Sequence, residues 1–278
     1  MDSFISFNLS KTIVSLTDNL DSYWKLDESS GNAADSVSSR TLTNSNVTYS
    51  AGKVNNCGVF NGSNARFQGS AWSPAGDYSI SMWINADTLP TTTVPLTSLF
   101  CNYDVPSSAQ DRGIDVILLN DGGTQKIQFF HGPYGGQVTA SYTKTLTTGN
   151  WYHLVAVYNG STVKLYLDGS EVASENASVD QPSLTKLINI GNFGYYTPLS
   201  SDLGRWFDGK IDEIAIWSKA LSSTEVSTLY NSGNGLQYPF TAATSIKSIN
   251  GLAIASVKSV NGLAIASVKS YNGLSNVS

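Results

Sequence analysis

The sequence predicts an all-β protein, a sandwich of two antiparallel sheets, and two observations carry this prediction. Residues 150–172 form a meander in which Trp151–Tyr158 alternates apolar and more polar residues and Val163–Leu167 returns beside it. The pairs Asn159-Gly160 and Asp168-Gly169 separate these runs, and such residues tolerate the positive φ of tight turns. The second observation is that short strand-like runs between turn signals recur along most of the chain, which is typical of a sandwich or jelly roll.

Nine further runs have the length and the Val, Ile, Tyr and Phe content of strands. They are Ser22–Leu26, Cys57–Phe60, Tyr78–Ala86, Leu96–Cys101, Gly113–Leu119, Lys126–His131, Gln137–Tyr142, Lys186–Ile190 and Lys210–Trp217.

One helix is expected near the end of this region. Ser222 with Glu225 three residues later fits a capping box, and an apolar stripe at helical spacing begins at Val226. Gly233 is the expected stop. We expect the helix to cover one end of the sandwich.

The pattern divides the chain of 278 residues into three parts. Residues 1–20 are expected to form an N-terminal arm or an added strand. Residues 21–240 hold the strand-like runs and form the predicted sandwich domain. Residues 241–278 are a tail in which an Asn-Gly pair recurs every 11 residues.

The 11-residue repeat in the tail predicts short hairpins, and we expect these hairpins to serve assembly or anchoring. Each Asn-Gly pair is a strong turn signal, and the segments between the pairs are rich in Val, Ile, Ala and Ser. Three such repeats bury little surface alone, so in a stable form they are expected to pack against another subunit or another protein. A flexible, partly ordered tail is the alternative, because small side chains offset little ordering entropy. The residues of the pairs are Asn250, Gly251, Asn261, Gly262, Asn272 and Gly273.

The composition of the chain restricts the classes of partner that we expect it to bind. Charged residues make up 13% of the chain, about half of the usual share of roughly 25%, as in many extracellular and virion proteins. The formal net charge of −5 argues against nucleic acid, and no apolar run approaches the roughly 20 residues of a membrane span. The N-terminus lacks the features of a secretory signal. A protein acting outside the cell is then expected to leave by another route or within a particle.

The two cysteines, Cys57 and Cys101, are too few for a disulfide scaffold. Their apolar surroundings in the sequence favour two buried free thiols. A single bridge between them remains the alternative.

Four segments in a fixed order resemble the laminin-G-like, concanavalin A-like lectin/glucanase family. They are Tyr23–Asn32, Val59–Ser63, Tyr78–Ile84 together with the meander, and Phe207–Trp217. The resemblance covers about residues 21–236 and implies a jelly roll of two antiparallel sheets packed face to face. The terminal repeat resembles tails of structural proteins of phages and phage-like injection machines, which assemble in the cytoplasm.

The acidic residues do not predict a catalytic site. Glycoside hydrolysis needs two carboxyl groups roughly 5–9.5 Å apart, and hydrolases of this fold set them two residues apart on one strand. Here Lys210 occupies the position between Asp208 and Asp212, and strand alternation sends Asp212 and Glu213 to opposite faces. His153, within the meander, is expected to be structural. We therefore expect no enzyme activity.

Two other kinds of site are predicted. Family members often carry a structural calcium near rim loops, and the candidate ligands here are Asp27, Asp35 and Asp212. The alternative is that Asp35 and Asp212 accept hydrogen bonds from loop amides. Glycan recognition needs exposed aromatic planes, which loop residues offer, whereas rim packing or a protein interface would use the same residues. The glycan candidates are Tyr103, Tyr195, Tyr196 and Trp206, with Trp72 and Tyr134 also beside loops.

These features predict a non-enzymatic structural or adhesion protein. We expect a virion or phage-like particle component (decoration, fibre or tail-associated) that displays a lectin-like sandwich. Its partners would be other structural proteins of the particle or further copies of itself, with a cell-surface glycan as ligand. The alternative is a carbohydrate-binding module of an exported bacterial protein, secreted or at the cell surface. A polysaccharide hydrolase or lyase is disfavoured because the acid pair is lacking.

Overall fold

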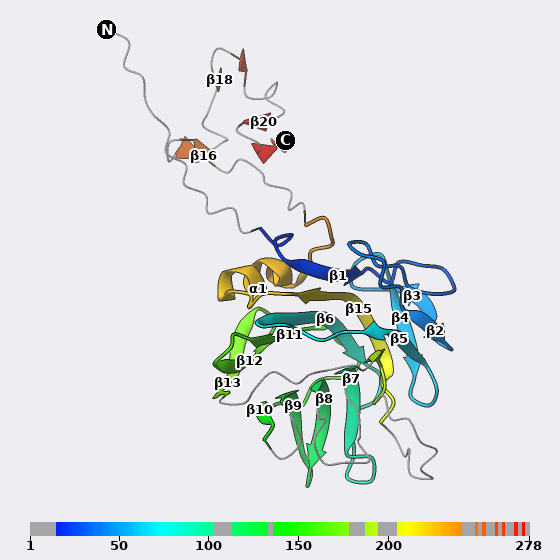
Figure 1. Ribbon diagram of the computed structural model, residues 1–278. Coiled ribbons are helices and arrows are strands. Elements are labelled where there is room, and N and C mark those ends of the chain that lie inside the picture. The colour runs from blue at the N-terminus through cyan, green and yellow to red at the C-terminus, as the bar shows by residue number, and fades with distance from the viewer. Residues whose placement is uncertain are drawn as a thin grey trace. The chain divides into compact units, whose positions relative to one another are not determined.

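Two antiparallel sheets face each other in a sandwich, as the sequence predicts (Figure 1). The computed structural model describes residues 15–102, 113–132, 136–177, 187–193 and 205–240, and six two-residue strands between residues 248 and 275. Residues Ser15–Tyr238 form one compact unit.

The first sheet has eight strands. Seven of them lie in the order β13 (Ser170–Asn176), β12 (Thr162–Leu167), β11 (Tyr152–Tyr158), β6 (Tyr78–Ala86), β15 (Asp208–Trp217), β4 (Asn56–Asn61) and β3 (Thr48–Ala51). The eighth, β1 (Leu20–Trp24), also pairs with β15. One edge of β15 is thus shared: β4 pairs with its first half and β1 with its second half.

The second sheet has seven strands. Their order is β10 (Val138–Thr143), β9 (Thr124–His131), β8 (Ile114–Asp121), β7 (Leu96–Asn102), β14 (Leu187–Ile190), β5 (Arg66–Ala71) and β2 (Thr43–Ser45). Alternate residues of these strands enter the core, as Ile114, Val116 and Leu118 of β8 do.

The strand predictions agree with eleven of these strands to within two residues at nearly every boundary, and β13 completes the predicted meander. Three strands were not predicted: β2, β3 and β5. Each is short, rich in polar residues and close to a sheet edge, and Phe67 is the one large apolar residue of β5, so the sequence shows little of the apolar alternation of a half-buried strand.

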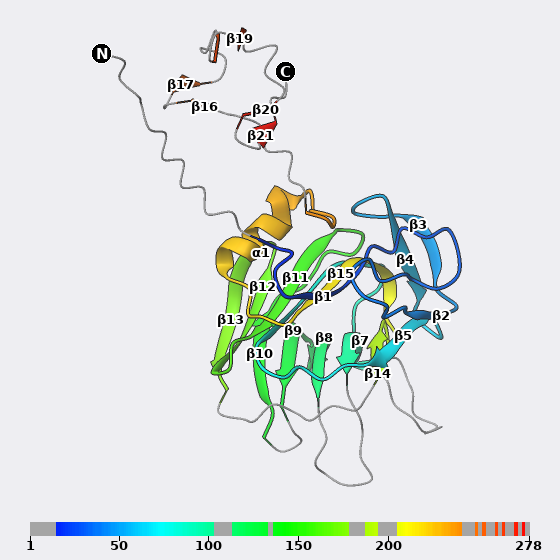
Figure 2. The same ribbon diagram turned by 45° about the horizontal axis from the view of Figure 1, so that its top comes forward.

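The helix α1 (Ser223–Tyr230) begins as predicted. The Ser222 hydroxyl accepts from the Glu225 amide and the Glu225 carboxylate accepts from the Ser222 amide, which completes the capping box. Asn231, at φ 49°, ends the helix two residues before the predicted Gly233, and a single turn of 3-10 helix, η1 (Asn231–Gly233), follows. Figures 1 and 2 show α1 on the outer side of the eight-stranded sheet, over the ends of its strands.

Part of the expected N-terminal arm belongs to the sandwich unit. Leu16 is buried, and its carbonyl accepts a 2.8 Å hydrogen bond from the indole Nε1 of Trp217. This bond fixes the chain just before β1. Residues 1–14 lie outside the described residues.

The tail contains three separate hairpins. Ile249 pairs with Leu252, Val260 with Leu263 and Tyr271 with Leu274, so the strands meet across each Asn-Gly pair in the same register. The strands are β16 (Ser248–Ile249), β17 (Leu252–Ala253), β18 (Ser259–Val260), β19 (Leu263–Ala264), β20 (Ser270–Tyr271) and β21 (Leu274–Ser275). The Asn-Gly residues themselves lie outside the described part.

Two further expectations have a clear outcome. Cys57 and Cys101 are both buried free thiols, on β4 and β7 of different sheets, so the disulfide bridge between them is excluded.

Among the described residues, none of the helices combines the length and the hydropathy of a membrane span.

Candidate functional site

Of the four glycan candidates, the structure describes only Trp206. Its side chain is partly exposed, next to the fully buried Phe207. Trp72 is 5% exposed and packs edge-on against Tyr78 and Phe100, so its ring belongs to the core. Tyr103, Tyr134, Tyr195 and Tyr196 lie outside the described residues.

The segments that carry the other candidates start and end around β7. Asn102, the last residue of β7, precedes Tyr103. Gly191, shortly before Tyr195, donates a 3.0 Å hydrogen bond to the Leu99 carbonyl, and the Arg205 carbonyl accepts one of 3.3 Å from Ser98. The two segments with predicted tyrosines are therefore anchored on the same strand, and Trp206 lies at one of these anchors.

A row of aligned residues, three of them polar, crosses the outer face of the seven-stranded sheet beside these anchors. The register aligns Phe130, Asp115, Cys101, Asn189 and Gln68 on five neighbouring strands. The Gln68 amide donates to Asn189 (3.0 Å). Asp115 and Asn189 are buried, whereas Gln68 and Phe130 are partly exposed.

Sequence analysis missed this row, although a signal for it exists. Asp115 lies between the core residues Ile114 and Val116 of β8, and Asn189 lies between the core residues Ile188 and Ile190 of β14. A polar residue that interrupts such an apolar strand marks an outer face with a hydrogen-bonding role.

Two of the predicted calcium ligands accept hydrogen bonds from backbone amides, as in the alternative interpretation. The Asp35 Oδ1 accepts from the amides of Tyr23 (3.0 Å), Val37 (2.9 Å) and Ser38 (3.1 Å). The Asp212 Oδ2 accepts from the backbone amides of residues 53 (2.8 Å) and 54 (2.9 Å), in the turn between β3 and β4.

Asp27 lies near Asp212, whereas Asp35 stabilises a different loop. The Asp27 carboxylate accepts from the Asn56 amide (3.1 Å) and from the Gln237 side chain (2.9 Å). Within the described ranges, no three His, Cys, Asp or Glu side chains gather as metal ligands. Calcium binding stays an untested prediction.

Asp212 and Glu213 lie on the same face of β15, so the prediction that they point to opposite faces is wrong. The core residues of β15 are Ile211, Ile214 and Ile216, and the first interval is three residues instead of two. The register against β6 shifts between Asp212 and Ala215, and Glu213 adopts φ 51°. This β-bulge inserts one extra residue and turns both carboxyl groups outward, where the partner strand changes from β4 to β1.

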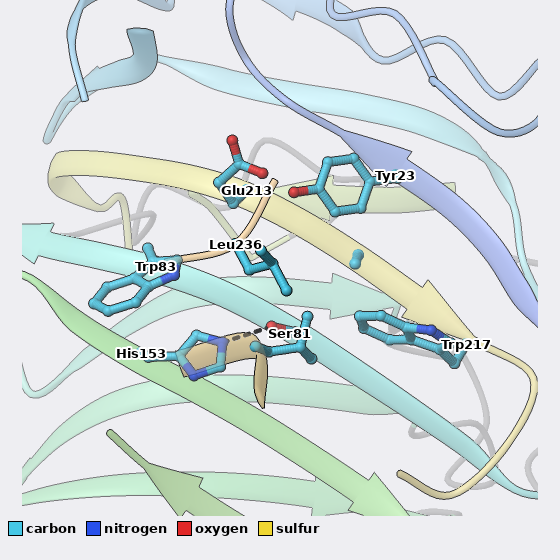
Figure 3. A pocket seen from close by; sticks show the side chains of 9 residues that line it. Tyr23, Ser81, Trp83, His153, Glu213, Trp217 and Leu236 are labelled. Carbon is cyan, nitrogen blue, oxygen red and sulfur yellow. Dashed lines mark hydrogen bonds between the residues drawn. The ribbon is translucent and has the colours of Figure 1, made fainter. Parts of the chain in front are cut away.

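Both carboxyl groups are enclosed. Asp212 is 0% and Glu213 4% exposed, and burial raises the pKa of Asp212 to about 7 and that of Glu213 to about 8. Glu213 borders a cavity of about 10 Å³, room for a single water molecule. Figure 3 shows this cavity and its lining by Tyr23, Ser81, Trp83, His153, Glu213, Trp217 and Leu236. A sugar ring has no access to the acid pair.

His153 is part of the scaffold, as expected. Its Nε2 shares a 2.9 Å hydrogen bond with the Ser81 hydroxyl. Its ring packs against Trp83 and Tyr230, with centroids 5.0 and 6.2 Å away, and these two rings also stack on each other at 5.8 Å. Burial lowers the pKa of His153 to about 3, so the imidazole is neutral near pH 7.

Residues 61–227 match the family described as the concanavalin A-like lectin/glucanases superfamily. Mouse and human pappalysin-1 are 24% and 23% identical over 163 residues. This match covers 55% of the chain but only 10% of either pappalysin, so the chain spans about a tenth of the curated relatives it matches.

Several solved structures share the fold. Domain 4 of AbnA, an extracellular GH43 arabinanase from Geobacillus stearothermophilus, solved in complex with arabinotriose, gives a TM-score of 0.54 at 21% identity and covers 75% of this chain and 97% of that one. The receptor-binding domain of botulinum neurotoxin C/D mosaic serotype gives 0.61 at 15% identity, over 78% of this chain and 52% of the toxin chain. The binding domain of Paraclostridial Mosquitocidal Protein 1 gives 0.59 at 17% identity, over 78% and 53%.

Proposed function

The chain belongs to the concanavalin A-like lectin/glucanases superfamily, and from this membership we propose that it is a non-catalytic, lectin-like protein that binds carbohydrate. The enclosure of Asp212 and Glu213 carries the proposal. Because a saccharide cannot reach these two carboxyl groups, they cannot hydrolyse it, and binding without catalysis is the function of the family that we favour. The arabinotriose bound to domain 4 of AbnA, which aligns over 97% of its length, supports a saccharide as ligand.

We place the binding surface at the loops anchored on β7. Trp206 offers a partly exposed indole there, and Tyr103, Tyr195 and Tyr196 belong to segments that start or end at the same strand. Aromatic planes stack on the apolar face of a sugar ring, and nearby polar groups such as Gln68 orient its hydroxyls. The protein would present this surface outside a cell or on a particle.

A glycan array that includes arabino-oligosaccharides tests the proposal. We expect one glycan class to bind, and Trp206→Ala and Tyr195→Ala each to weaken that binding about tenfold, which corresponds to about 1.4 kcal/mol. Val37→Ser is the matched control, since Val37 is 38% exposed and lies on the loop after β1. Absence of binding to any glycan at millimolar concentration would overturn the proposal. Binding that both aromatic variants retain would place the site elsewhere.

A second function, assembly into a phage-like or other particle, is favoured by the three hairpins of the tail. Their identical register repeats one unit every 11 residues, and a two-residue strand pair is too short to be stable alone. Pairing with the tails of further copies or with another structural protein would extend these strands.

Light scattering after size exclusion, on the full chain and on a chain ending at Phe240, tests this second function. We expect an oligomer for the full chain and a monomer for the shortened one, both with the far-UV spectrum of a folded sandwich. An unchanged mass would remove the tail from assembly and leave glycan binding as the function.

A further inference from the structure

Two arginines, Arg66 and Arg205, lie at the surface that we propose for the glycan. Arg205 is exposed and Arg66 is partly exposed. Among the described residues, the ion pairs belong to other basic side chains: Arg40 with Asp21, Lys126 with Asp121, Lys164 with Glu171 and Lys219 with Glu225. The two unpaired guanidinium groups make this surface locally positive on a chain whose formal net charge is −5.

The strand register places Arg66 beside Gly191. In the seven-stranded sheet β14 lies between β5 and β7 (Figure 2), and Ile190, the last residue of β14, pairs with Phe67 of β5. Because these two strands are antiparallel, the next pair of residues is Gly191 and Arg66. Phe67 belongs to the core, so strand alternation directs the Arg66 side chain to the outer face, where Gln68 also lies.

Arg205 and Trp206 reach the same position through the backbone. The Phe207 amide donates a 2.8 Å hydrogen bond to the Gly191 carbonyl, and the Ser98 amide donates one of 3.3 Å to the Arg205 carbonyl. These two bonds fix the chain on both sides of Trp206. The partly exposed indole and the two arginines therefore surround Gly191.

An aromatic ring orients the Arg205 guanidinium. The guanidinium lies over the Phe193 ring, 4.8 Å from its centroid. A guanidinium held in this way uses its face for the ring and keeps the N–H groups at its edge available for an acceptor. The contact also restricts the side chain before a ligand arrives, so less conformational entropy is lost on binding.

The acidic residues nearest in the sequence and the register have other contacts. Asp115 is 6% exposed and accepts a 2.7 Å hydrogen bond from the Ser98 hydroxyl. Asp208 begins β15, pairs with Asn61 of the other sheet, and lies with its Cβ against Gly62. Within the described part of the chain neither forms an ion pair with Arg66 or Arg205. The opposite charge is therefore expected from a ligand.

We propose that Arg205 and Arg66 form an anion subsite beside Trp206, and that the saccharide bound by this protein is acidic. This inference rests on the carbohydrate binding proposed above and adds the class of ligand. The indole would stack on the sugar ring, while Arg205 binds a carboxylate or sulfate group of that sugar through two parallel hydrogen bonds. Arg66, on the other side of Gly191, adds a second positive charge.

Calorimetric titration of the full chain with matched acidic and neutral saccharides tests the subsite. Sialyllactose and sulfated lactose are compared with lactose, and trigalacturonate with its methyl ester. We expect at least one acidic saccharide to bind about tenfold more tightly than its neutral counterpart, as a charge-assisted hydrogen bond supplies. The acidic saccharide that binds best identifies the group as a carboxylate or a sulfate. Salt screens exposed charges, so this preference should decrease between about 50 mM and about 500 mM NaCl.

Substitutions of the two arginines assign the preference to this subsite. Arg205→Gln should remove most of the roughly tenfold preference and leave the affinity for the neutral saccharide unchanged. Arg205→Lys keeps the charge but not the planar pair of donors, so it should retain part of the preference. Arg66→Gln should reduce the preference by about half, because exposed charges interact weakly. Lys25→Gln, on the chain after β1, removes the same charge elsewhere and should behave as the wild type.

The possible failures of this proposal and of carbohydrate binding are distinct. The subsite is overturned if the acidic and neutral saccharides bind equally, or if Arg205→Gln keeps the wild-type preference, and in both cases carbohydrate binding stands. Equal losses of acidic and neutral binding in Arg205→Gln would show that Arg205 only supports the loop, which also overturns the subsite. If none of the saccharides binds, and the glycan array is empty too, carbohydrate binding fails and the subsite fails with it.

Discussion

Between Ile211 and Ile214 the strand β15 directs two acidic residues outward, where regular alternation places one. The spacing of the isoleucines at 211, 214 and 216 is visible in the sequence and indicates the extra residue. The amides that receive Asp212 come from residues 53 and 54, more than 150 positions away. Such a contact depends on the pairing of β15 with β4, which local pattern does not contain.

Gly191 is expected to tolerate no side chain. It adopts φ +80°, and an added Cβ would lie 2.2 Å from the Phe60 ring. Gly191→Ala should lower the free energy of unfolding by about 3 kcal/mol, from overpacking and backbone strain together. Gly76→Ala, where an added Cβ would meet no atom within 4 Å, should stay within about 0.5 kcal/mol of the wild type in urea unfolding. Equal losses in both variants would contradict this assignment.

Calcium is expected to leave the melting temperature unchanged. The oxygens of Asp35 and Asp212 already accept from several backbone amides, and Asp27 accepts from Asn56 and Gln237. An ion would have to displace these donors. About 5 mM calcium exceeds the dissociation constants of roughly 10⁻⁴–10⁻³ M of weak extracellular calcium sites. Thermal unfolding at this calcium concentration and thermal unfolding in a chelator should coincide. A rise that disappears in Asp27→Asn would restore the calcium interpretation.

Among the elements, those with strong local signals were predicted and those without were not. The helix α1 carries its own start in Ser222 and Glu225, and the meander strands carry turns and alternation. The strands β2, β3 and β5 exist because neighbours pair with them, and their sequences are largely polar: β5 buries only Phe67 and Gly69, and β2 and β3 bury no residue. Short strands at or next to a sheet edge, such as these, are determined by tertiary pairing.

The capping box should contribute measurably to the stability of α1. Ser222→Ala removes the acceptor for the Glu225 amide and is expected to lower the free energy of unfolding by about 1 kcal/mol. For a domain of this size that is a fall in Tm of about 2–4 °C. The neighbouring exposed Ser223→Ala serves as the control in the same calorimetric scan. A loss of similar size there would show that the cap has no special role.

For the whole molecule, four buried groups predict how stability varies with pH. Burial lowers the pKa of His131 to about 4 and of His153 to about 3, and raises those of Asp212 and Glu213 to about 7 and about 8. Below pH 6.5 the unfolded chain alone protonates the histidines, so stability falls as the pH falls. Above pH 4.5 the folded chain alone keeps the acid protons, so stability falls as the pH rises.

These opposite slopes, each about 1.4 kcal/mol per pH unit and group, cancel between about pH 4.5 and 6.5. We expect a plateau there and a decline of about 2 kcal/mol from pH 6.5 to 8, where the histidines no longer contribute. Urea unfolding at intervals of half a pH unit measures the profile. Glu213→Gln should flatten the decline. Stability that increases from pH 6.5 to 8 would contradict these pKa directions.

At this scale the sequence predicts the two sheets, most of their strands and the absence of a disulfide. It does not predict which loops meet. The anchoring of two candidate segments on β7 follows from Gly191 and Arg205, which bond to that strand across about 90 or more residues. The candidate glycan-binding residues could be named from the sequence, because aromatic residues in predicted loops are recognisable. The anchoring of their segments on one strand could not be predicted.

The position of β15 has a consequence for how the protein is made. β15 is the shared partner of β1, β4 and β6, so the middle of the eight-stranded sheet stays incomplete until Trp217 has been synthesised. Until then β4 and β6 expose hydrogen-bonding edges along a nascent chain of roughly 200 residues, and such edges favour aggregation. Closure over this sequence separation also makes folding slow. The sandwich is therefore completed from its centre, by its last strand.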